Sequence, residues 1–167
     1  TLVIFTSDNG YAWGERGVTS KGLPYVESVK VPFLVRWPGV FAAGATIEHP
    51  VGGVDLLPTL LEAAGYEPPV LGYPLDGRSL FRSGGRDEIL LEMHEGHRGI
   101  PNWASLRNND WQYIEYYEDP DPQNTLPAFR EYYVMVEDPW QLEILFGSGI
   151  ARRPLGRVDG RDPGRIV

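Results

Sequence analysis

The most constraining feature of the sequence is a single change of pattern near Gly84-Gly85. Before it come two apolar stretches without polar alternation, at residues 2–5 and 33–37, and a helical repeat that begins at Asp55 and ends at Gly65. Unalternating apolar strands are typical of sheets covered on both faces, and strands that alternate with helices favour a parallel sheet. The first part of the chain is therefore predicted to belong to an α/β core.

Beyond residue 86 the pattern predicts a small sheet of a different kind. Aromatic-rich strand candidates follow one another at residues 88–93, 103–107, 111–117 and 131–136. The turn residues Asn108-Asn109-Asp110 lie between the middle two candidates, which predicts antiparallel pairing. Asp138-Pro139 and the apolar stripe up to Leu145 predict a short closing helix, because Asp caps helices and Pro fits their first turn.

These patterns divide the chain into three parts. Residues 1–85 are expected to be a portion of an α/β core, and residues 86–150 a small antiparallel subdomain. Residues 151–167 are rich in Arg and have little to bury, so a mobile tail is expected. The chain opens at Thr1 directly into a strand, without a Met, which predicts that an upstream half of the domain is missing.

Composition excludes several classes of function. The formal charge of −8 repels polyanions, so nucleic acid is not an expected partner. The longest apolar runs are far shorter than the roughly 20 residues of a membrane-spanning helix, so no transmembrane segment is predicted. The chain has no Cys, which excludes disulfides, thiolate metal ligands and a Cys nucleophile.

Asp8 and Asn9 stand where the first predicted strand ends, before the turn residue Gly10. In open α/β sheets ligands collect at the ends of strands. A carboxylate beside an amide carbonyl suits a hard cation such as Ca²⁺ or Mg²⁺, although Ca²⁺ needs about 6–8 oxygens. The dipeptide alone is more typical of an ordinary Asx turn, and both interpretations stay open.

Lys21 follows Asp8 by thirteen residues, across a loop that contains several glycines. It is one of only two lysines among the fifteen basic residues. A lysine ammonium is a compact point charge that suits an anionic oxygen. The alternative is a solvated lysine on a surface loop.

In their order and spacing, several motifs resemble the type I, arylsulfatase-like sulfatases of the alkaline phosphatase superfamily. The resemblance covers about residues 1–147 and places the chain in the C-terminal part of the family's sequence. The motifs are Thr6-Ser7-Asp8-Asn9-Gly10, Gly14-Glu15-Arg16-Gly17, Lys21, Tyr25-Val26-Glu27-Ser28-Val29-Lys30-Val31-Pro32, Val54 to Leu61, Asp76 to Leu80, Trp111 to Tyr116, Glu131-Tyr132-Tyr133 and Asp138-Pro139.

The resemblance implies a fold and part of a site. The fold would be the C-terminal portion of a sulfatase-like α/β core, followed by the small antiparallel sheet and its closing helix. Ca²⁺ would be held by Asp8 and Asn9, with two acidic ligands from the missing N-terminal half, and Lys21 would contact the sulfate. Family members act on sulfate esters and are often exported or lysosomal; the compartment of this chain stays undetermined.

The family's nucleophile is a formylglycine made from the Cys or Ser of a Cys/Ser-X-Pro-X-Arg motif, and these 167 residues do not contain that motif. The chain is therefore expected to contribute part of a sulfuric ester hydrolase without being competent alone. Two alternatives stay open. One is a phosphonate or phosphodiester hydrolase of the same superfamily, and the other is a free-standing non-catalytic domain that binds an anion or a partner.

Three further features leave alternatives. Many relatives have His where this chain has Arg16, which can bind an anion but cannot shuttle protons near neutral pH; the alternative is an ordinary arginine on a surface loop. His94 and His97 could form a metal pair or border the substrate cleft of a full-length relative, but two ligands do not make a closed zinc site. The aromatic residues of 103–133 fit sheet packing better than a sugar platform.

Overall fold

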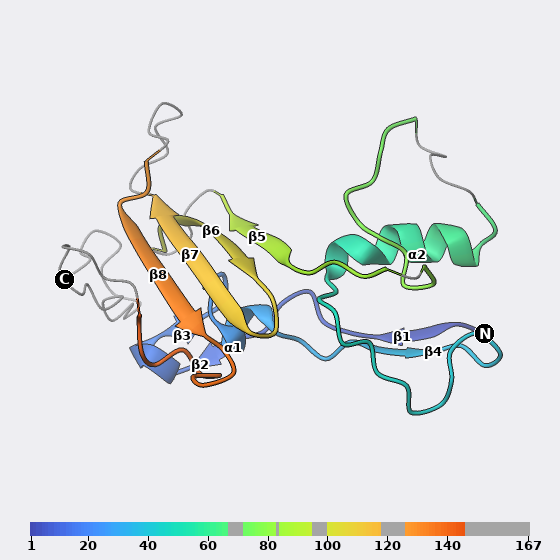
Figure 1. Ribbon diagram of the computed structural model, residues 1–167, viewed down its shortest axis with the longest axis horizontal. Helices are drawn as coiled ribbons and strands as arrows, with labels where there is room; N and C mark the ends of the chain where they lie inside the picture. Colours follow the sequence, from blue (N-terminus) through green and yellow to red (C-terminus); the bar gives the residue numbers. More distant parts are fainter. Residues whose placement is uncertain (67–71, 83, 95–99, 118–125, 146–167) are drawn as a thin grey trace. The chain divides into compact units, whose positions relative to one another are not determined.

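The computed structural model describes residues 1–66, 72–82, 84–94, 100–117 and 126–145 (Figure 1). They divide into two compact units. The first consists of residues 1–6 and 33–89, and the second of residues 7–32 with the described chain from residue 90 onward. The segment with the candidate site residues thus packs with the later sheet. The domain limits at residues 85 and 86 stay a prediction, and the predicted tail lies outside the described residues.

In the first unit, strand β1 (Val3–Phe5) pairs with strand β4 (Leu34–Arg36) in antiparallel register, with Val3 opposite Arg36. The expectation of a parallel pair is therefore wrong for these two strands. Parallel neighbours need a long crossover, usually a helix that packs on the sheet. Here the chain between the strands leaves for the second unit, and its helix α1 (Val26–Val29) has only four residues.

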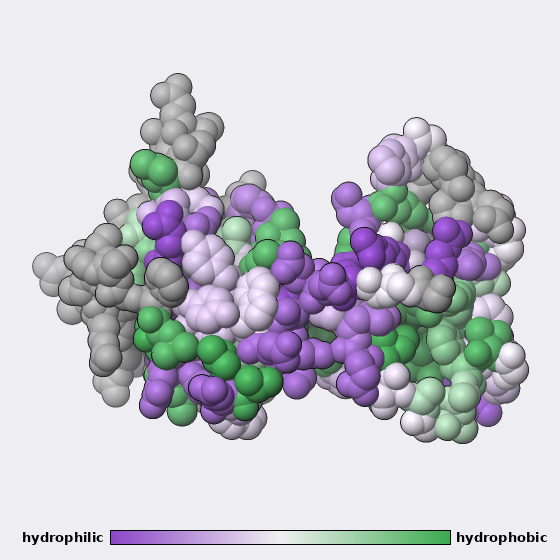
Figure 2. Space-filling model, viewed as in Figure 1, coloured by the Kyte–Doolittle hydropathy of each residue, from purple (hydrophilic) through white to green (hydrophobic). Residues whose placement is uncertain are grey.

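The side chains of this strand pair are more exposed than the sequence predicts. Val3, Phe5 and Leu34 have 49%, 62% and 63% of their surface exposed. Figure 2 shows apolar, green surface over this unit. The expectation of a strand covered on both faces is wrong within the described residues, because the residues of both strands alternate between exposed and part-exposed and none is buried.

Helix α2 (Leu56–Ala63) lies within the range predicted as helical, and the short helix η2 (Gly53–Asp55) precedes it. The predicted end is confirmed: Gly65 has a φ of 82°, a conformation that favours glycine. Asp55 is buried and joins this region to residues further along the chain. Its carboxylate accepts the backbone N–H groups of Gly52 at 2.9 Å and Arg78 at 2.8 Å, and it pairs with the guanidinium of Arg86.

The second unit contains a sheet with the order β5 (Ile89–Met93), β6 (Asn102–Arg107), β7 (Trp111–Tyr117) and β8 (Phe129–Val134) (Figure 1). Strands β6, β7 and β8 pair antiparallel, so the predicted antiparallel sheet is confirmed. Asn108 forms the predicted turn, because its Oδ1 accepts the N–H groups of Asp110 and Trp111 at 2.8 and 2.9 Å. Buried and part-exposed residues alternate along β7, as in a sheet with one face on a core.

The core of the second unit joins this sheet to residues 12–26. Trp103, Tyr116 and Tyr133 are at most 5% exposed, as the packing interpretation of the aromatic residues predicts. They cluster with Val18, Leu23 and Tyr25 from the earlier segment. The loop that carries Lys21 therefore rests on the sheet.

The predicted closing helix over residues 138–145 is wrong, because this segment forms turns. Gln141 has a φ of 55° and is fully buried. Its Oε1 accepts the backbone N–H of Val26 at 2.9 Å, and its Nε2 donates to Gln112 Oε1 at 3.0 Å. These hydrogen bonds to the core need the side chain to point inward from a turn, and they outweigh the local helix signals of Asp138-Pro139.

No helix in the described part of the chain is long and apolar enough to cross a membrane.

Candidate functional site

The predicted site residues Asp8, Asn9 and Lys21 lie in the second unit. Lys21 Nζ donates a hydrogen bond to Asn9 Oδ1 at 3.0 Å. The other end of the Asn9 amide, Nδ2, donates to the carbonyl of Gly10 at 2.8 Å, which orients the oxygen towards the lysine. Asp8 is exposed, and its Oδ1 accepts the backbone N–H of Asn9 at 2.9 Å. The structure thus brings Lys21 and Asn9 into contact and leaves Asp8 beside them.

Helix α1 holds both ends of the loop between Asn9 and Lys21. The N–H of Gly10 donates to Ser28 O at 2.8 Å. The N–H groups of Gly22 and Leu23 donate to Ser28 Oγ at 2.9 and 3.2 Å. A Cβ atom on Gly10 would lie only 2.1 Å from the carbonyl oxygen of Glu27, so this close approach requires glycine. Ser28 is therefore the residue that closes the loop.

The sheet supports the same loop from another side. The indole N–H of Trp103, on β6, donates to Gly22 O at 2.8 Å. Gly22 has a φ of 84°, and a Cβ there would lie 2.9 Å from the Met93 side chain on β5. The backbone next to Lys21 is thus fixed by a turn that favours glycine and by a buried donor.

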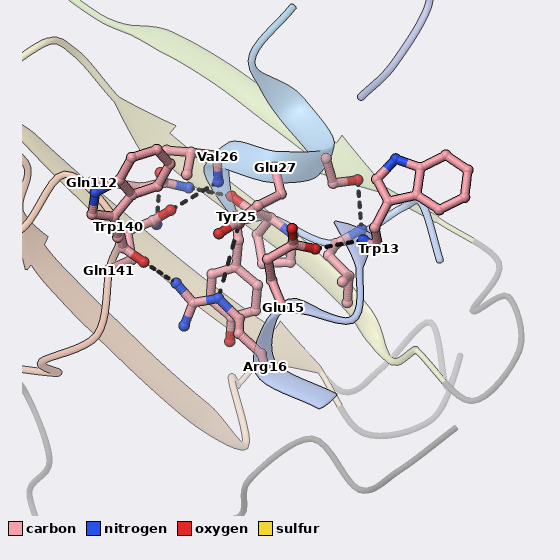
Figure 3. A network of polar contacts seen from close by, with 12 residues as sticks. Trp13, Glu15, Arg16, Tyr25, Val26, Glu27, Gln112, Trp140 and Gln141 are labelled. Atoms are coloured by element: carbon pink, nitrogen blue, oxygen red, sulfur yellow. Dashed lines mark hydrogen bonds and ion pairs between the residues drawn. The ribbon is translucent and has the colours of Figure 1, made fainter. Parts of the chain in front are cut away.

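Between these ends the chain forms a small hairpin, β2 (Ala12–Trp13) and β3 (Thr19–Ser20), with the short helix η1 (Glu15–Gly17) at its tip. Arg16 lies in η1 with a φ of 55°. Its side chain points into the protein (Figure 3), where the guanidinium carbon lies 3.9 Å from the centre of the Tyr25 ring. The guanidinium donates to Trp140 O, and Nε lies 4.0 Å from the Glu27 carboxylate. Arg16 therefore ties the hairpin to the protein body.

A buried carboxylate lies behind this arginine. Glu131 is 4% exposed, and the hydroxyls of Tyr25 and Tyr116 donate to it at 3.2 and 3.0 Å. Burial raises the pKa of Glu131, and hydrogen bonds from the surrounding tyrosines offset only part of that rise. The pKa of Tyr25 is raised by burial and by the Glu131 charge. This cluster holds the residue that precedes α1, and it is a structural support rather than part of the reacting surface.

The oxygen atoms near Asp8 are of the kind that binds a hard cation, but they are too few to complete its coordination. A carboxylate and an amide carbonyl are oxygen ligands of the kind that Ca²⁺ prefers, but Ca²⁺ takes about 6–8 of them. Asn9 Oδ1 accepts from Lys21, and an amide oxygen has a second lone pair for a cation. The residues that the structure describes contain no group of three or more His, Cys, Asp and Glu that could hold a metal ion.

His94 lies at the end of the β5 segment with an exposed side chain, 3.8 Å from the carboxylate of Glu92. His97 lies outside the described residues, so the structure does not test the interpretation of the two histidines as a metal pair. Sequence reasoning assigned no function to Ser28, Gln112, Gln141 or Glu131. Ser28, Gln112 and Glu131 stand in motifs that carried the resemblance, and that was the only signal that could have drawn attention to them.

The chain is similar in sequence to known sulfatases. The Sulfatase family model matches residues 1–66. An N-acetylglucosamine-6-O-sulfatase of Bacteroides thetaiotaomicron is 28% identical over 156 residues, which are 89% of this chain and 27% of that protein. A choline-sulfatase of Rhizobium meliloti is 29% identical over 162 residues, or 95% of this chain and 28% of that protein. The chain spans less than a third of the length of these relatives.

The chain is also similar to solved structures. One, in complex with its substrate D-glucosamine-2-N,6-O-disulfate, matches with a TM-score of 0.75 and 27% identity, over 89% of this chain and 30% of that chain. Another, a putative sulfatase from Bacteroides fragilis, matches with a TM-score of 0.70 and 19% identity, over 87% of this chain and 31% of that chain. At that identity the second match bears on the fold alone. The described strands and few helices are consistent with a portion of the sulfatase α/β fold.

Proposed function

We propose that this chain is the C-terminal portion of a sulfatase, a sulfuric ester hydrolase, and that it supplies part of the sulfate and cation site. The observation that carries the proposal is the 3.0 Å hydrogen bond from Lys21 Nζ to Asn9 Oδ1, beside Asp8. A cationic donor contacts an amide oxygen there, and the carboxylate of Asp8 belongs to the neighbouring residue, within a segment that matches the Sulfatase family model. The partners of this portion are the sulfate ester and the N-terminal half of the same enzyme.

Lys21 is the residue that contacts the sulfate. Its ammonium donates hydrogen bonds and carries a compact positive charge, so it neutralises charge on the non-bridging oxygens as the ester bond breaks. Asn9 holds this ammonium in one position, and the Gly10 and Ser28 contacts hold Asn9 and Lys21 in one loop. Preorganised charge of this kind lowers the barrier because no rearrangement is needed during the reaction.

Asp8 and Asn9 would hold Ca²⁺ through their side-chain oxygens. A bound Ca²⁺ supplies Lewis-acid stabilisation of the negatively charged sulfate oxygens. The remaining ligands, including two acidic ones, would come from residues outside this chain. The same holds for the formylglycine nucleophile, so we expect no ester hydrolysis by this chain alone.

The substrate is a sulfate ester. The relatives named above include enzymes for an amino-sugar sulfate and for a choline sulfate. Nothing in these matches favours a phosphonate or phosphodiester hydrolase, or a non-catalytic binding domain.

The test is sulfate binding to the full chain, monitored by two-dimensional NMR during titration with sodium sulfate. We expect Lys21→Ala to weaken binding about tenfold or more, because a hydrogen bond to a charged group contributes about 1.5–3 kcal/mol. Lys30→Ala is the matched control: it removes the other lysine, which is exposed and lies outside the loop. Equal sulfate affinity for Lys21→Ala and the wild-type chain would refute the proposal.

A further inference from the structure

An exposed pair of aromatic rings lies on the hairpin that leads to Lys21. Tyr11 and Trp13 are 37% and 78% exposed, and their ring centres are 4.8 Å apart with planes inclined at 52°. Figure 3 shows the Trp13 indole directed away from the polar network around Arg16. The two rings are therefore open to solvent, in contrast to the buried aromatic residues of the sheet.

The register of the hairpin places this ring pair on the same face as Lys21. Trp13 stands opposite Thr19 and Ala12 opposite Ser20, and Tyr11 and Lys21 are the residues that flank this two-residue ladder at the same end. Residues directly opposite each other in an antiparallel pair share a face, with Cβ atoms about 5 Å apart. Exposure agrees with this register: Tyr11, Trp13, Thr19 and Lys21 are exposed, whereas Ala12 and Ser20 are buried.

The hairpin that presents these rings is held in place. The backbone N–H of Trp13 donates to the Glu15 carboxylate, and the N–H of Gly14 donates to Val18 O at 3.0 Å. Arg16 ties the tip to the buried Tyr25. Exposed apolar rings cost free energy in water, and their burial against a ligand recovers it without first ordering a mobile loop.

We propose that Tyr11 and Trp13 form a platform for a pyranose ring, so that the substrate is a sulfated sugar whose sulfate reaches Lys21. This inference rests on the proposed function of Lys21. A sugar presents both apolar C–H faces and hydroxyl groups. Tyr11 Oη and Trp13 Nε1 have no hydrogen-bond partner among the described residues, and both can donate to sugar hydroxyls at the edge of the stacked ring. A flat aryl group would leave these donors without acceptors.

The experiment compares the affinity of the full chain for glucose 6-sulfate, phenyl sulfate and inorganic sulfate, measured by NMR titration. We expect glucose 6-sulfate to bind about tenfold more tightly than inorganic sulfate, with the Trp13 indole N–H resonance shifted by the sugar only. Trp13→Ala and Tyr11→Ala should each reduce that difference and leave the affinity for inorganic sulfate unchanged. Trp140→Ala is the control, because Trp140 is also exposed, at 63%, and lies on the other side of the network in Figure 3.

The outcomes separate this inference from the proposed function. If Trp13→Ala keeps the full preference for glucose 6-sulfate, or if phenyl sulfate binds more tightly than glucose 6-sulfate, the sugar platform is wrong while the sulfate contact of Lys21 stands. If Lys21→Ala leaves binding of inorganic sulfate unchanged, the proposed function fails and the platform, which depends on it, fails too.

Discussion

The hydroxyl oxygen of Ser28 accepts a hydrogen bond from the backbone N–H of Gly22 at 2.9 Å, and this contact fixes the residue next to Lys21. Ser28 is 3% exposed, so water cannot replace its oxygen without rearrangement. Its own carbonyl accepts from Gly10, the residue next to Asn9. One residue of a four-residue helix thus sets the separation of the two side chains that meet in the candidate site.

Ser28→Ala should weaken both stability and sulfate binding. The substitution leaves the N–H groups of Gly22 and Leu23 without their acceptor, and an unpaired buried donor costs about 1–3 kcal/mol. We expect urea denaturation to show this loss, and NMR titration to show weaker sulfate binding. Ser79→Ala is the control, because Ser79 Oγ accepts the N–H of Phe81 in the first unit. Sulfate affinity that falls equally in both variants would contradict the assigned role of Ser28.

Gly10→Ala should distort the same loop by overpacking. The added methyl would lie 2.1 Å from the carbonyl oxygen of Glu27, and backbone atoms cannot move aside as a flexible side chain does. We expect a loss of about 1–3 kcal/mol in the free energy of unfolding, together with weaker sulfate binding. Gly53→Ala is the control, because no atom lies within 4 Å of the position that its new methyl group would take. An unchanged stability of Gly10→Ala would show that the loop adapts.

Calcium binding should depend on the charge of Asp8. Asp8→Asn keeps the shape of the side chain but removes the carboxylate, the stronger of the two proposed ligands. We expect the affinity of the full chain for Ca²⁺ to fall about tenfold, measured by NMR titration with CaCl₂. Asp87→Asn is the control, since Asp87 is an exposed acid in the first unit. Equal Ca²⁺ affinity in both variants would remove Asp8 from the cation site.

The sheet of the second unit could be predicted because its signal is local. In β7, Gln112, Ile114 and Tyr116 are buried and their neighbours are not, and this period of two is visible in the sequence. The direction of the β1 and β4 pair could not be predicted in this way. Strand direction depends on the route of the chain between the strands, and here that route passes through the other unit.

Long-range hydrogen bonds explain why the predicted closing helix was wrong and why part of the candidate site could not be predicted. Gln141 bonds to Val26 and Gln112, which lie far from it in sequence, so the local helix signals around it were misleading. The contact between Lys21 and Asn9 likewise spans twelve residues, and no periodicity predicts it. Only the resemblance to a family brought these two residues together before the structure did. Ser28 lies in one of the motifs of that resemblance, but nothing local to it indicates its role, because a serine in a loop-rich segment is ordinary.

The buried ion pair of Asp55 and Arg86 should be important for the stability of the first unit. Asp55→Asn leaves the Arg86 guanidinium buried without its counter-charge, which typically costs about 3–5 kcal/mol. Glu62→Gln is the matched control, because its pair with Arg82, at 3.3 Å, is largely exposed and such pairs contribute about 0–1 kcal/mol. Chemical denaturation of both variants measures the difference. Equal losses would mean that Asp55 contributes no more than a surface charge.

Glu131 should make stability fall as pH rises. Burial raises its pKa above the ordinary value of 4.5, so the folded chain binds more protons than the unfolded chain in the window between these two values. Stability therefore decreases with rising pH through that window. Glu131→Gln keeps a neutral side chain of the same shape and should remove this contribution. Urea denaturation from about pH 4 to pH 7 measures the slope of the free energy of unfolding for both chains.

The control for this slope is Glu115, which lies in the same sheet and contributes to the pH dependence of stability with the opposite sign. Partial burial alone would raise its pKa, but hydrogen bonds from Tyr113, Tyr117 and Arg130 outweigh it, so the pKa of Glu115 is lowered. Its contribution to stability is present above the ordinary pKa and is lost as pH falls through the lowered one. Glu115→Gln should therefore remove a gain in stability with rising pH below the ordinary pKa of 4.5, whereas Glu131→Gln removes a loss above it, so the denaturation series for Glu115 extends down to about pH 3. If both substitutions changed the slope in the same direction, the hydrogen bonds from Tyr25 and Tyr116 would outweigh the burial of Glu131, and its pKa would be lowered rather than raised.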